Sequence, residues 1–339
     1  MITRKVSIGN IEVGGGNPVA IQGMLKNPLD NLDELFKEAL RMRSAGADII
    51  RCAVPESNCA HDIYKAISSV GVPLVADCHF QTDIVISCIE AGFDKVRVNP
   101  GNMGIDGIRK VIECAKKNET AIRFGFNTGS CDAKTGDDLA RAALDLDSWV
   151  REQGYENYVI SMKSSSVLQT VAANRYFSVY SDTPLHIGVT ATGIINEGII
   201  KSSIGLGALL LDGIGDTLRV SLTGDSIEEI RIGHLLFDIC TEQTNRLQLI
   251  SCPTCSRKRA DVEELTGKFL SSLSEADFRK PVKVAIMGCE VNGPGEARES
   301  DIGICATKKG ALLIAGGKIL KTIKQENILS SLKEYLDKL

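Results

Sequence analysis

Three cysteines in the C-terminal third of the sequence have the spacing of metal ligands. Cys252 and Cys255 form a Cys-x-x-Cys motif, and Cys289 begins a glycine- and proline-rich stretch that ends at Glu296. Two thiolates three positions apart on a turn can reach one metal centre, and a third thiolate on a tight turn can close one face of it. The pattern therefore predicts a metal or redox centre in this part of the chain.

The spacing by itself leaves three kinds of centre open, because Cys-x-x-Cys serves iron–sulfur clusters, structural zinc and redox dithiols alike. A zinc ribbon needs a fourth Cys or His, and no histidine follows His234. The fourth ligand is then Glu296, Cys305 or no protein group at all. Three thiolates with a weak or open fourth position suit a cluster that does chemistry at one iron better than a closed zinc site.

A second group of polar residues stands at the ends of the predicted strands. These residues are Arg51, Asp77, His79, Arg97, Asn99, Arg123, Asn127, Lys163, His186 and Arg219. A cation in an apolar strand is costly unless it has a partner, and the cations in this group outnumber the acids. The surplus positive charge predicts a polyanionic ligand such as a diphosphate, whose oxygens suit the arginine fork.

The two histidines of this group have two interpretations. His79 and His186 are either neutral residues held by a backbone carbonyl, or donors to a phosphate or a substrate hydroxyl. Arg219 is less clear than the other arginines, because it could pair with Asp216 inside a barrel.

An alternation of strands and helices would position these residues. Between residues 18 and 243, short apolar runs alternate with amphipathic stretches of helical length. Near-continuous apolar runs are typical of a parallel sheet buried on both faces, and eight such units predict an α/β fold, a (β/α)8 TIM-like barrel. In such a barrel the carboxyl ends of the strands meet at one mouth, where a site is expected. The expected strands are 19–24, 48–54, 73–78, 95–98, 121–126, 158–162, 185–189 and 217–222.

The remainder of the sequence predicts a second domain. We expect residues 1–243 to form the barrel, which binds phosphate and substrate, and residues 244–339 to form a small α+β domain that carries the cysteine motif and its metal or redox centre. Gly316-Gly317 reads as a hairpin turn between two strands. The elements expected here are helices 262–273 and 327–339 and strands 282–287, 302–306, 312–315 and 318–323.

Composition narrows the class of protein. The 339 residues are 43% hydrophobic and 24% charged, which is ordinary for a globular protein. A net charge of −4 gives no argument for nucleic acid or an anionic membrane, and no apolar run is long enough to span a bilayer. Eleven scattered cysteines and an N-terminus without a signal-like segment favour a cytoplasmic protein with reduced thiols.

Several motifs resemble the 4-hydroxy-3-methylbut-2-enyl diphosphate synthase family of the non-mevalonate isoprenoid pathway. The likeness extends almost from end to end and includes the cysteine motif described above. The motifs that carry it are Ala-Asp-Ile-Ile-Arg at 47–51, Val-Ala-Asp-Cys-His-Phe at 75–80, Arg-Val-Asn-Pro-Gly-Asn at 97–102, Ile-Arg-Phe-Gly-Phe-Asn at 122–127, Gly-Ile-Gly-Asp-Thr-Leu-Arg-Val-Ser at 213–221 and Asn-Gly-Pro-Gly-Glu at 292–296.

The resemblance implies a reaction and a cofactor. It implies a [4Fe-4S] cluster on Cys252, Cys255 and Cys289, with Glu296 as the fourth ligand. The family's substrate is 2-C-methyl-D-erythritol 2,4-cyclodiphosphate, which is opened and reductively dehydrated with two electrons from flavodoxin or ferredoxin. The resemblance also implies a homodimer in which the cluster domain of one subunit caps the barrel of its partner.

The resemblance also assigns roles to the residues at the strand ends. The family's diphosphate contacts fall on Arg51, Arg97, Arg123, Asn127 and Lys163. We expect Asn99 and His186 to line the same pocket. The residues expected to take part in catalysis are Glu296, Lys163 and His79.

One departure from the family bears on the substrate. The family motif Gly-x-Thr-Glu-Ala-Gly is replaced at 188–193, so that Ala191 stands in the position of the glutamate. Glu197, a few residues further on, is a candidate replacement for this acid. The alternative functions are a paralogue that acts on another small phosphorylated substrate and, less favoured, a metal-binding or sensing module.

Overall fold

The computed structural model describes residues 2–78, 81–128, 133–190, 192–241, 247–274 and 281–338. The chain divides by contact into two compact units, residues 1–242 and 243–339, and each is described by itself. Within the described ranges, no helix has both the length and the apolar character that crossing a bilayer requires.

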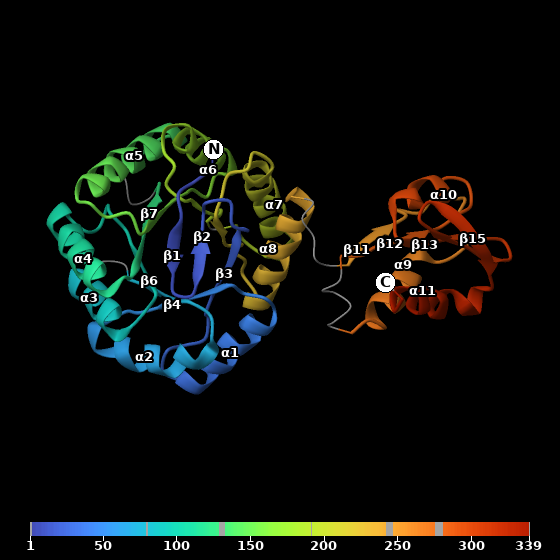
Figure 1. The fold of residues 1–339 in the computed structure, drawn as a ribbon, viewed down its shortest axis with the longest axis horizontal. Helices are drawn as coiled ribbons and strands as arrows, with labels where there is room; N and C mark the ends of the chain where they lie inside the picture. The colour runs from blue at the N-terminus through green and yellow to red at the C-terminus, as the bar shows by residue number, and fades with distance from the viewer. Residues whose placement is uncertain are drawn as a thin grey trace. The chain divides into compact units, whose positions relative to one another are not determined.

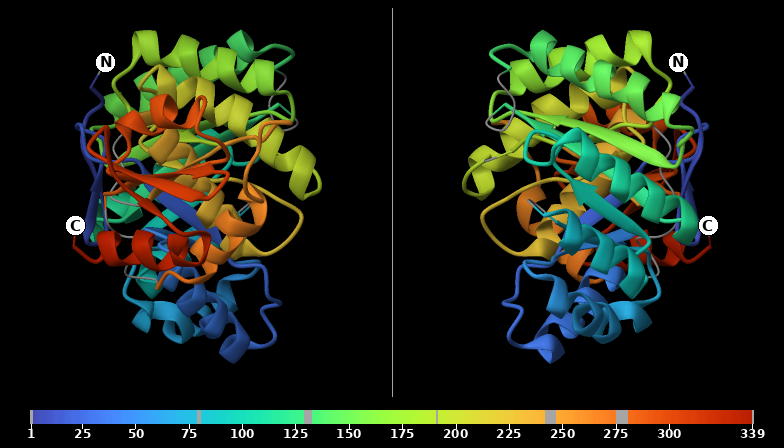
Figure 2. Two further views of the ribbon diagram at one scale, coloured as in Figure 1. Left: turned by 90° about the vertical axis from the view of Figure 1, so that its right-hand side faces the viewer. Right: turned by 90° about the vertical axis from the view of Figure 1, so that its left-hand side faces the viewer.

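The first unit contains a sheet of eight parallel strands. Helices surround this sheet, as Figures 1 and 2 show. The strand order is β8-β7-β6-β5-β4-β3-β10-β9, and a parallel bridge between Ile160 and Leu185 joins the two edges. The expected (β/α)8 barrel is therefore confirmed. Its strands are β3 (Ala20–Met24), β4 (Ile49–Ala53), β5 (Leu74–Asp77), β6 (Lys95–Val98), β7 (Ala121–Asn127), β8 (Tyr158–Lys163), β9 (His186–Ile187) and β10 (Thr217–Leu218).

Three helices of this unit, α1, α5 and α6, begin at side-chain caps that the sequence supplies. The Asn31 side chain accepts the Glu34 N–H before α1, and Thr135 and Asp138 form a reciprocal capping box at α5. Such caps satisfy the free N–H groups of the first turn. The helices are α1 (Leu32–Ser44), α2 (Ala60–Ile67), α3 (Thr82–Ala91), α4 (Ile105–Asn118), α5 (Gly136–Glu152), α6 (Val167–Tyr180), α7 (Ile195–Leu211) and α8 (Ser226–Thr241).

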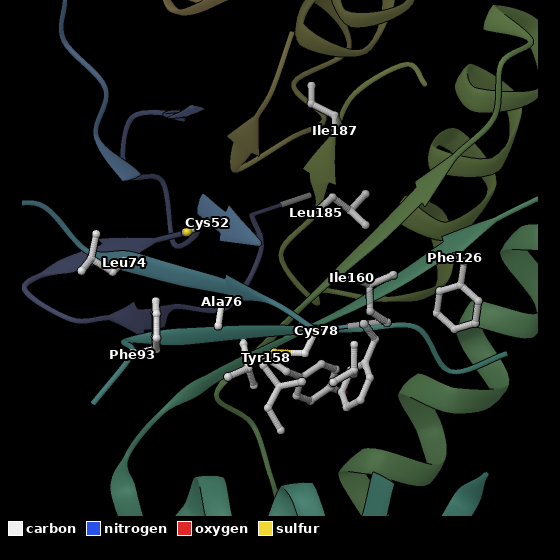
Figure 3. Packing of buried hydrophobic residues seen from close by; sticks show 14 of the residues in the cluster. Cys52, Leu74, Ala76, Cys78, Phe93, Phe126, Tyr158, Ile160, Leu185 and Ile187 are labelled. Atoms are coloured by element: carbon white, nitrogen blue, oxygen red, sulfur yellow. The ribbon is translucent and has the colours of Figure 1, made fainter. Parts of the chain in front are cut away.

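Alternation along the strands separates two environments. Outward side chains form the apolar core against the helices, and Figure 3 shows Ala76, Tyr158 and Ile160 among them. Inward side chains enter the barrel itself. Because successive strand residues point to opposite faces, the residue type at every second position decides what the barrel contains.

An N-terminal hairpin closes one end of the barrel. Strands β1 (Val6–Ile8) and β2 (Ile11–Val13) pair antiparallel. Their apolar residues pack against the inward residues Ala20, Ile49 and Val75 and form an apolar floor with them. The sequence analysis did not predict this hairpin, because runs of three residues are too short to show alternation.

Two barrel strands are shorter than expected. β9 ends at Ile187 and β10 at Leu218, whereas runs to residues 189 and 222 were predicted. The pairing continues only as isolated backbone bonds, such as the one from the Arg219 N–H to the Ile187 carbonyl at 3.1 Å.

The second unit is a five-stranded mixed sheet with the order β11-β12-β13-β14-β15. β11, β12 and β13 are parallel, so the unit opens with a βαβ arrangement that the expected segregation of strands and helices did not include. The predicted hairpin turn is confirmed, because Gly316 and Gly317 have φ angles of +52° and +73° between antiparallel strands. The elements are β11 (Gln248–Ser251), α9 (Val262–Ser271), β12 (Lys283–Met287), α10 (Gly293–Glu296), β13 (Ile302–Thr307), β14 (Gly310–Ala315), β15 (Lys318–Ile323) and α11 (Ile328–Leu336).

The two faces of this sheet differ. α9 and α11 cover one face with an apolar cluster that includes Phe269 and Leu332. The other face carries a smaller cluster of Met287, Cys305 and Ile314, with Cys252 packed against it. Cys252 also packs against the first cluster, so it stands at the edge of the sheet between the two clusters.

Candidate functional site

The inward positions of the barrel become basic beyond the apolar floor. Arg51, Arg97 and Arg123 each stand two residues after an inward floor-level position, on β4, β6 and β7. All three are buried, as are Lys163 at the end of β8 and His186 on β9. Barrel interiors are usually filled by branched apolar side chains, so this interior is built for a ligand rather than for stability alone.

One carboxylate faces two of the arginines. Asp77 Oδ2 lies 3.6 Å from Arg51 Nε, and Asp77 Oδ1 lies 3.6 Å from Arg97 Nη1. Burial lowers the pKa of Arg97, and the neighbouring Arg51 lowers it further, while Asp77 opposes both effects. A single acid between two guanidinium groups leaves a net positive charge at this level of the barrel.

Arg123 has the least compensation of the three arginines. Its side chain is 2% exposed, and within the described residues its Nε and Nη1 have no hydrogen-bond partner. Burial lowers the pKa of Arg123 well below its ordinary value, and the charges of Arg51 and Arg97 act in the same direction. Since arginine does not deprotonate in proteins, the lowered pKa means that the buried charge of Arg123 would be stabilised by a bound anion.

Lys163 and His186 complete this basic group. The pKa of Lys163 is lowered well below its ordinary value by burial and then by Arg123 and Arg51. His186 Nδ1 lies 2.7 Å from Thr217 Oγ1, whereas its Nε2 has no partner among the described residues. Burial and the nearby cations lower the pKa of His186, so the ring is neutral and can donate or accept at Nε2.

The two asparagines have different positions. Asn99 is buried, and its Oδ1 accepts the Gly101 N–H at 3.1 Å, which shapes the loop after β6. Asn127 ends β7 in register with Lys163, beside the mouth. The structure thus places Asn127 next to a basic residue and gives Asn99 a local structural contact.

Arg219 does not pair with Asp216, contrary to the alternative that the sequence left open. Its Nη2 lies 3.2 Å from the Glu229 carboxylate, which also binds Lys26 Nζ at 2.8 Å. Asp216 instead accepts the Leu185 N–H at 2.8 Å. Glu229 thus neutralises part of the charge on this side of the barrel.

Sequence reasoning missed two buried polar residues of the barrel. Lys95 is fully buried and Gln22 is 1% exposed, and within the described residues their side-chain polar atoms have no hydrogen-bond partner. Lys95 stands two residues before Arg97 on β6, so strand alternation could have placed both on the inward face. In the sequence, Lys95 is the first residue of the expected strand 95–98, and no role was predicted for it.

Two residues of the expected site, His79 and Ala191, lie outside the described residues. Glu197, the candidate replacement for the missing acid, begins α7 and lies 2.6 Å from Lys201 Nζ one turn later. The Lys201 ammonium lowers the pKa of Glu197, which makes this carboxyl a poor proton donor. The geometry therefore disfavours Glu197 as the replacement.

The cysteine loops follow neighbouring parallel strands of the second unit. Cys252 comes directly after β11, and its N–H donates to the Ile286 carbonyl of β12 at 3.0 Å. Cys289 follows the end of β12 by two residues. A Cβ at Gly288 would stand 3.6 Å from Cys252 Sγ, so the first sulfur lies beside the residue that precedes Cys289.

Backbone N–H groups point at two of the cysteine sulfurs. The Val291 and Asn292 N–H groups lower the pKa of Cys289, with a smaller contribution from the Arg257 side chain. The Thr254 N–H donates to Cys252 Sγ at 3.4 Å, in a turn where Thr254 has φ +63°. Backbone N–H groups directed at cysteine sulfur stabilise the charged form that binds metal. Cys255 and Glu296 are exposed on the same loops.

Cys305 is a poor candidate for the fourth ligand. Its side chain is buried, and a Cβ at Gly293 would stand 2.7 Å from its sulfur. Burial raises the pKa of Cys305 to about 12, and the charges of Cys289 and Glu296 add to the effect. The sequence left Cys305 and Glu296 open as the fourth ligand. A buried, neutral thiol is less able to bind a metal centre than the exposed carboxylate of Glu296.

The donor geometry bears on the kind of metal centre. In the part of the chain that the structure describes, no three His, Cys, Asp or Glu side chains converge closely enough for a single metal ion. A structural zinc site needs four donors around one point. Cysteine thiolates on two adjacent loops are a donor type that a [4Fe-4S] cluster binds, with one donor to each iron.

Comparisons with known proteins cover both units. Residues 3–234 match the GcpE TIM-barrel domain, and residues 248–338 match the GcpE protein C-terminal domain. This chain belongs to the GcpE family.

Curated members of the GcpE family are similar over the whole chain. A protein of Caldanaerobacter subterraneus subsp. tengcongensis is 40% identical over 347 residues, which span 100% of this chain and 97% of that protein. A protein of Clostridium perfringens is 39% identical, with 99% of this chain and 98% of that protein covered. Both are named 4-hydroxy-3-methylbut-2-en-1-yl diphosphate synthase (flavodoxin).

Solved structures of lower identity share the fold alone. Dihydropteroate synthase from Thermus thermophilus superposes with a TM-score of 0.54 at 14% identity, covering 71% of this chain and 100% of that chain. The enzyme of the same name from Burkholderia cenocepacia has a TM-score of 0.53 at 13% identity, covering 72% of this chain and 100% of that chain. These likenesses support the barrel architecture of this GcpE-family chain and carry no argument about its reaction.

Proposed function

We propose that this chain catalyses the reductive ring-opening dehydration of 2-C-methyl-D-erythritol 2,4-cyclodiphosphate to 4-hydroxy-3-methylbut-2-enyl diphosphate in isoprenoid biosynthesis. The relatives that match the full chain carry the name of this synthase. The enzyme is an iron–sulfur oxidoreductase that takes its electrons from flavodoxin or ferredoxin in the cytoplasm.

The observation that carries the proposal is the concentration of buried positive charge in the barrel. Arg51, Arg97, Arg123 and Lys163 are all less than a tenth exposed, and Asp77 is the acid between two of them. Guanidinium groups bind phosphate oxygens through paired N–H donors, and the low dielectric of the interior strengthens each contact. A diphosphate would satisfy the donors of Arg123 that have no partner in the described structure.

The residues of the barrel have separable roles in this reaction. Arg51, Arg97 and Arg123 hold the diphosphate and stabilise the charge that develops on its oxygen when the ring opens. Lys163 binds the same group from the end of β8, and the neutral His186 ring can hold a proton or a hydroxyl group at Nε2. We also propose that Asn99 and Asn127 line the diphosphate pocket. His79 is proposed to take part in catalysis.

The second unit would hold a [4Fe-4S] cluster on Cys252, Cys255 and Cys289, with Glu296 as the fourth ligand. When bound, the cluster supplies single electrons and a Lewis-acidic iron. The Val291 and Asn292 N–H groups lower the pKa of Cys289, which favours the thiolate form that binds iron. Glu296 is the exposed last residue of α10, and its carboxylate would be the fourth donor to the cluster.

A homodimer is the assembly that we propose for this enzyme. Large apolar side chains are exposed along α7 and α8, among them Ile200, Ile204, Leu211, Leu235 and Ile239, each between 57% and 72% exposed. Contiguous exposed apolar surface on a globular unit marks an interaction site. A second copy of the chain would cover this surface.

An anaerobic assay tests the proposed reaction. The protein is reconstituted with iron and sulfide, reduced flavodoxin and the cyclodiphosphate are added, and the linear butenyl diphosphate is quantified. Formation of this product over several turnovers supports the proposal. A protein that holds about four irons, binds the cyclodiphosphate and forms no product would refute it.

A further inference from the structure

The floor of the barrel contains a lysine whose charge nothing in the described structure neutralises. Lys95 is fully buried, and its Nζ has no hydrogen-bond partner among the described residues. Burying an unpaired ammonium group costs several kcal/mol, so such a lysine is either neutral or waiting for an anion.

The register shows that this side chain enters the barrel. Lys95 pairs with Val75 on β5 and with Ala121 on β7. Both partners belong to the apolar floor above the N-terminal hairpin, whereas the next residue, Val96, belongs to the outer core. Residues in register on neighbouring parallel strands point to the same face. Lys95 therefore lies beneath the basic group and shares its interior.

Neighbouring groups discourage a charge on Lys95 in the free protein. Burial lowers the pKa of Lys95 well below its ordinary value, and Arg123 and Arg51 lower it further. Lys95 in turn contributes to the lowered pKa of His186, so the two groups interact electrostatically. The charged and titratable groups of the surrounding strands are Arg51 on β4, Asp77 on β5, Arg97 on β6, Arg123 on β7, Lys163 on β8 and His186 on β9.

The floor also offers neutral polar atoms to a ligand or to water. Gln22 is 1% exposed, and neither atom of its amide has a hydrogen-bond partner in the described residues. Gln22 is in register with Ile49 of the apolar floor, as Lys95 is with Val75. Two buried inward polar side chains without partners among the described residues indicate an interior completed by something other than the protein.

We propose that Lys95 is a further anion-binding residue of this site, which takes up a proton when a diphosphate occupies the barrel and then supplies a cation from below. This inference rests on the proposed function in one respect: the anion is taken to be a diphosphate because the proposed substrate is one. The negative charge of the ligand offsets the repulsion by the arginines, so an ammonium group becomes favourable at Lys95.

Proton-linked calorimetry tests the proposal. Inorganic pyrophosphate is titrated into the full, anaerobically reconstituted chain in two buffers of different ionisation enthalpy, which gives the number of protons taken up on binding. Wild type should take up about one proton more per bound pyrophosphate than Lys95→Met, and Lys95→Met should bind about tenfold or more weakly. Protons released by pyrophosphate itself are common to both proteins and cancel in the difference.

Two further variants separate charge from structure. Lys95→Arg carries a permanent charge, so it should retain affinity but lose the extra proton, which a merely structural role would not produce. Lys110→Met removes an exposed lysine of α4 and should leave both quantities unchanged. If either Lys95 variant fails to fold, the other still decides the proton count.

Either of two results would overturn the inference: wild type and Lys95→Met take up equal numbers of protons, or wild type does not bind pyrophosphate. The outcome is independent of turnover. A chain that shows the proton difference but makes no butenyl product would refute the proposed function and leave the role of Lys95 standing.

Discussion

The Lys163 ammonium lies directly over Gly188, where a Cβ would stand 2.6 Å from Nζ. The same relationship holds between Arg97 and Gly125, where a Cβ would stand 3.0 Å from Nε. Neither glycine has the positive φ that requires glycine for the backbone. Their lack of a side chain instead leaves room for long basic side chains to lie inside the barrel.

Gly188→Ala should therefore weaken diphosphate binding by displacing Lys163, and it also presses on the Arg219 carbonyl, which would stand 2.9 Å from the new Cβ. Because a hydrogen bond to a charged group contributes about 1.5–3 kcal/mol, we expect KM to rise about tenfold or more. Steady-state kinetics with the cyclodiphosphate measures the change. Gly104→Ala, at a position where a Cβ would meet no atom within 4 Å, is the matched control. An unchanged KM in Gly188→Ala would show that Lys163 does not contact the substrate.

Two cysteines of the second unit should respond differently to serine. Cys289→Ser removes a sulfur whose thiolate the backbone stabilises, so iron content and brown absorbance after reconstitution should fall sharply. Cys305→Ser should retain the cluster but lower the free energy of unfolding by about 1–3 kcal/mol, because it buries a hydroxyl group in an apolar cluster. Loss of iron from Cys305→Ser would instead identify Cys305 as a ligand.

His186 should make the stability of the barrel depend on pH. Burial and nearby cations lower the pKa of His186 in the folded state, whereas in the unfolded chain it titrates near 6.5. Below about pH 6.5 the unfolded chain takes up the proton and the folded chain does not, so stability is lost as the pH falls. Above this pH the ring is neutral in both states and contributes no pH dependence.

A comparison with His186→Gln isolates this contribution. At pH 7.5 the variant should be about 1 kcal/mol less stable, because the contact with Thr217 is lost. The difference in the free energy of unfolding should shrink as the pH falls from about 6.5 to about 5. Protonation of His186 in the unfolded chain favours unfolding of wild type, and the variant has no such group. Urea unfolding followed by Trp149 fluorescence reports on the barrel, because this is the one tryptophan of the sequence. Parallel pH profiles would contradict the prediction.

The exposed apolar surface of α7 and α8 should control assembly. Ile204→Glu places a charge on a residue that is 59% exposed in the isolated chain, and it should weaken dimerisation by a factor of about 30 or more. Light scattering coupled to size exclusion measures the mass over a range of concentrations. Lys110→Glu, on the exposed face of α4, serves as the charge control. A dimer of unchanged affinity in Ile204→Glu would place the interface elsewhere.

Much of this protein could be predicted from its sequence because two kinds of signal are local. Eight apolar runs separated by amphipathic stretches indicate a parallel barrel, and strand alternation places Arg51, Arg97 and Arg123 on one face of each strand. Cys252, Cys255 and Cys289 are recognisable from residue type and spacing. These signals depend on neighbours along the chain.

Only the tertiary structure decided which groups meet across strands. Three findings depend on register: the pairing of Arg219 with Glu229 rather than Asp216, the burial of Cys305 beneath Gly293, and the lack of a hydrogen-bond partner for Lys95 among the described residues. The N-terminal hairpin is recognised only in the structure, by its packing against the apolar floor of the barrel. Register and burial are set by the packing of segments far apart in the sequence, and no local pattern encodes the distance between two such residues.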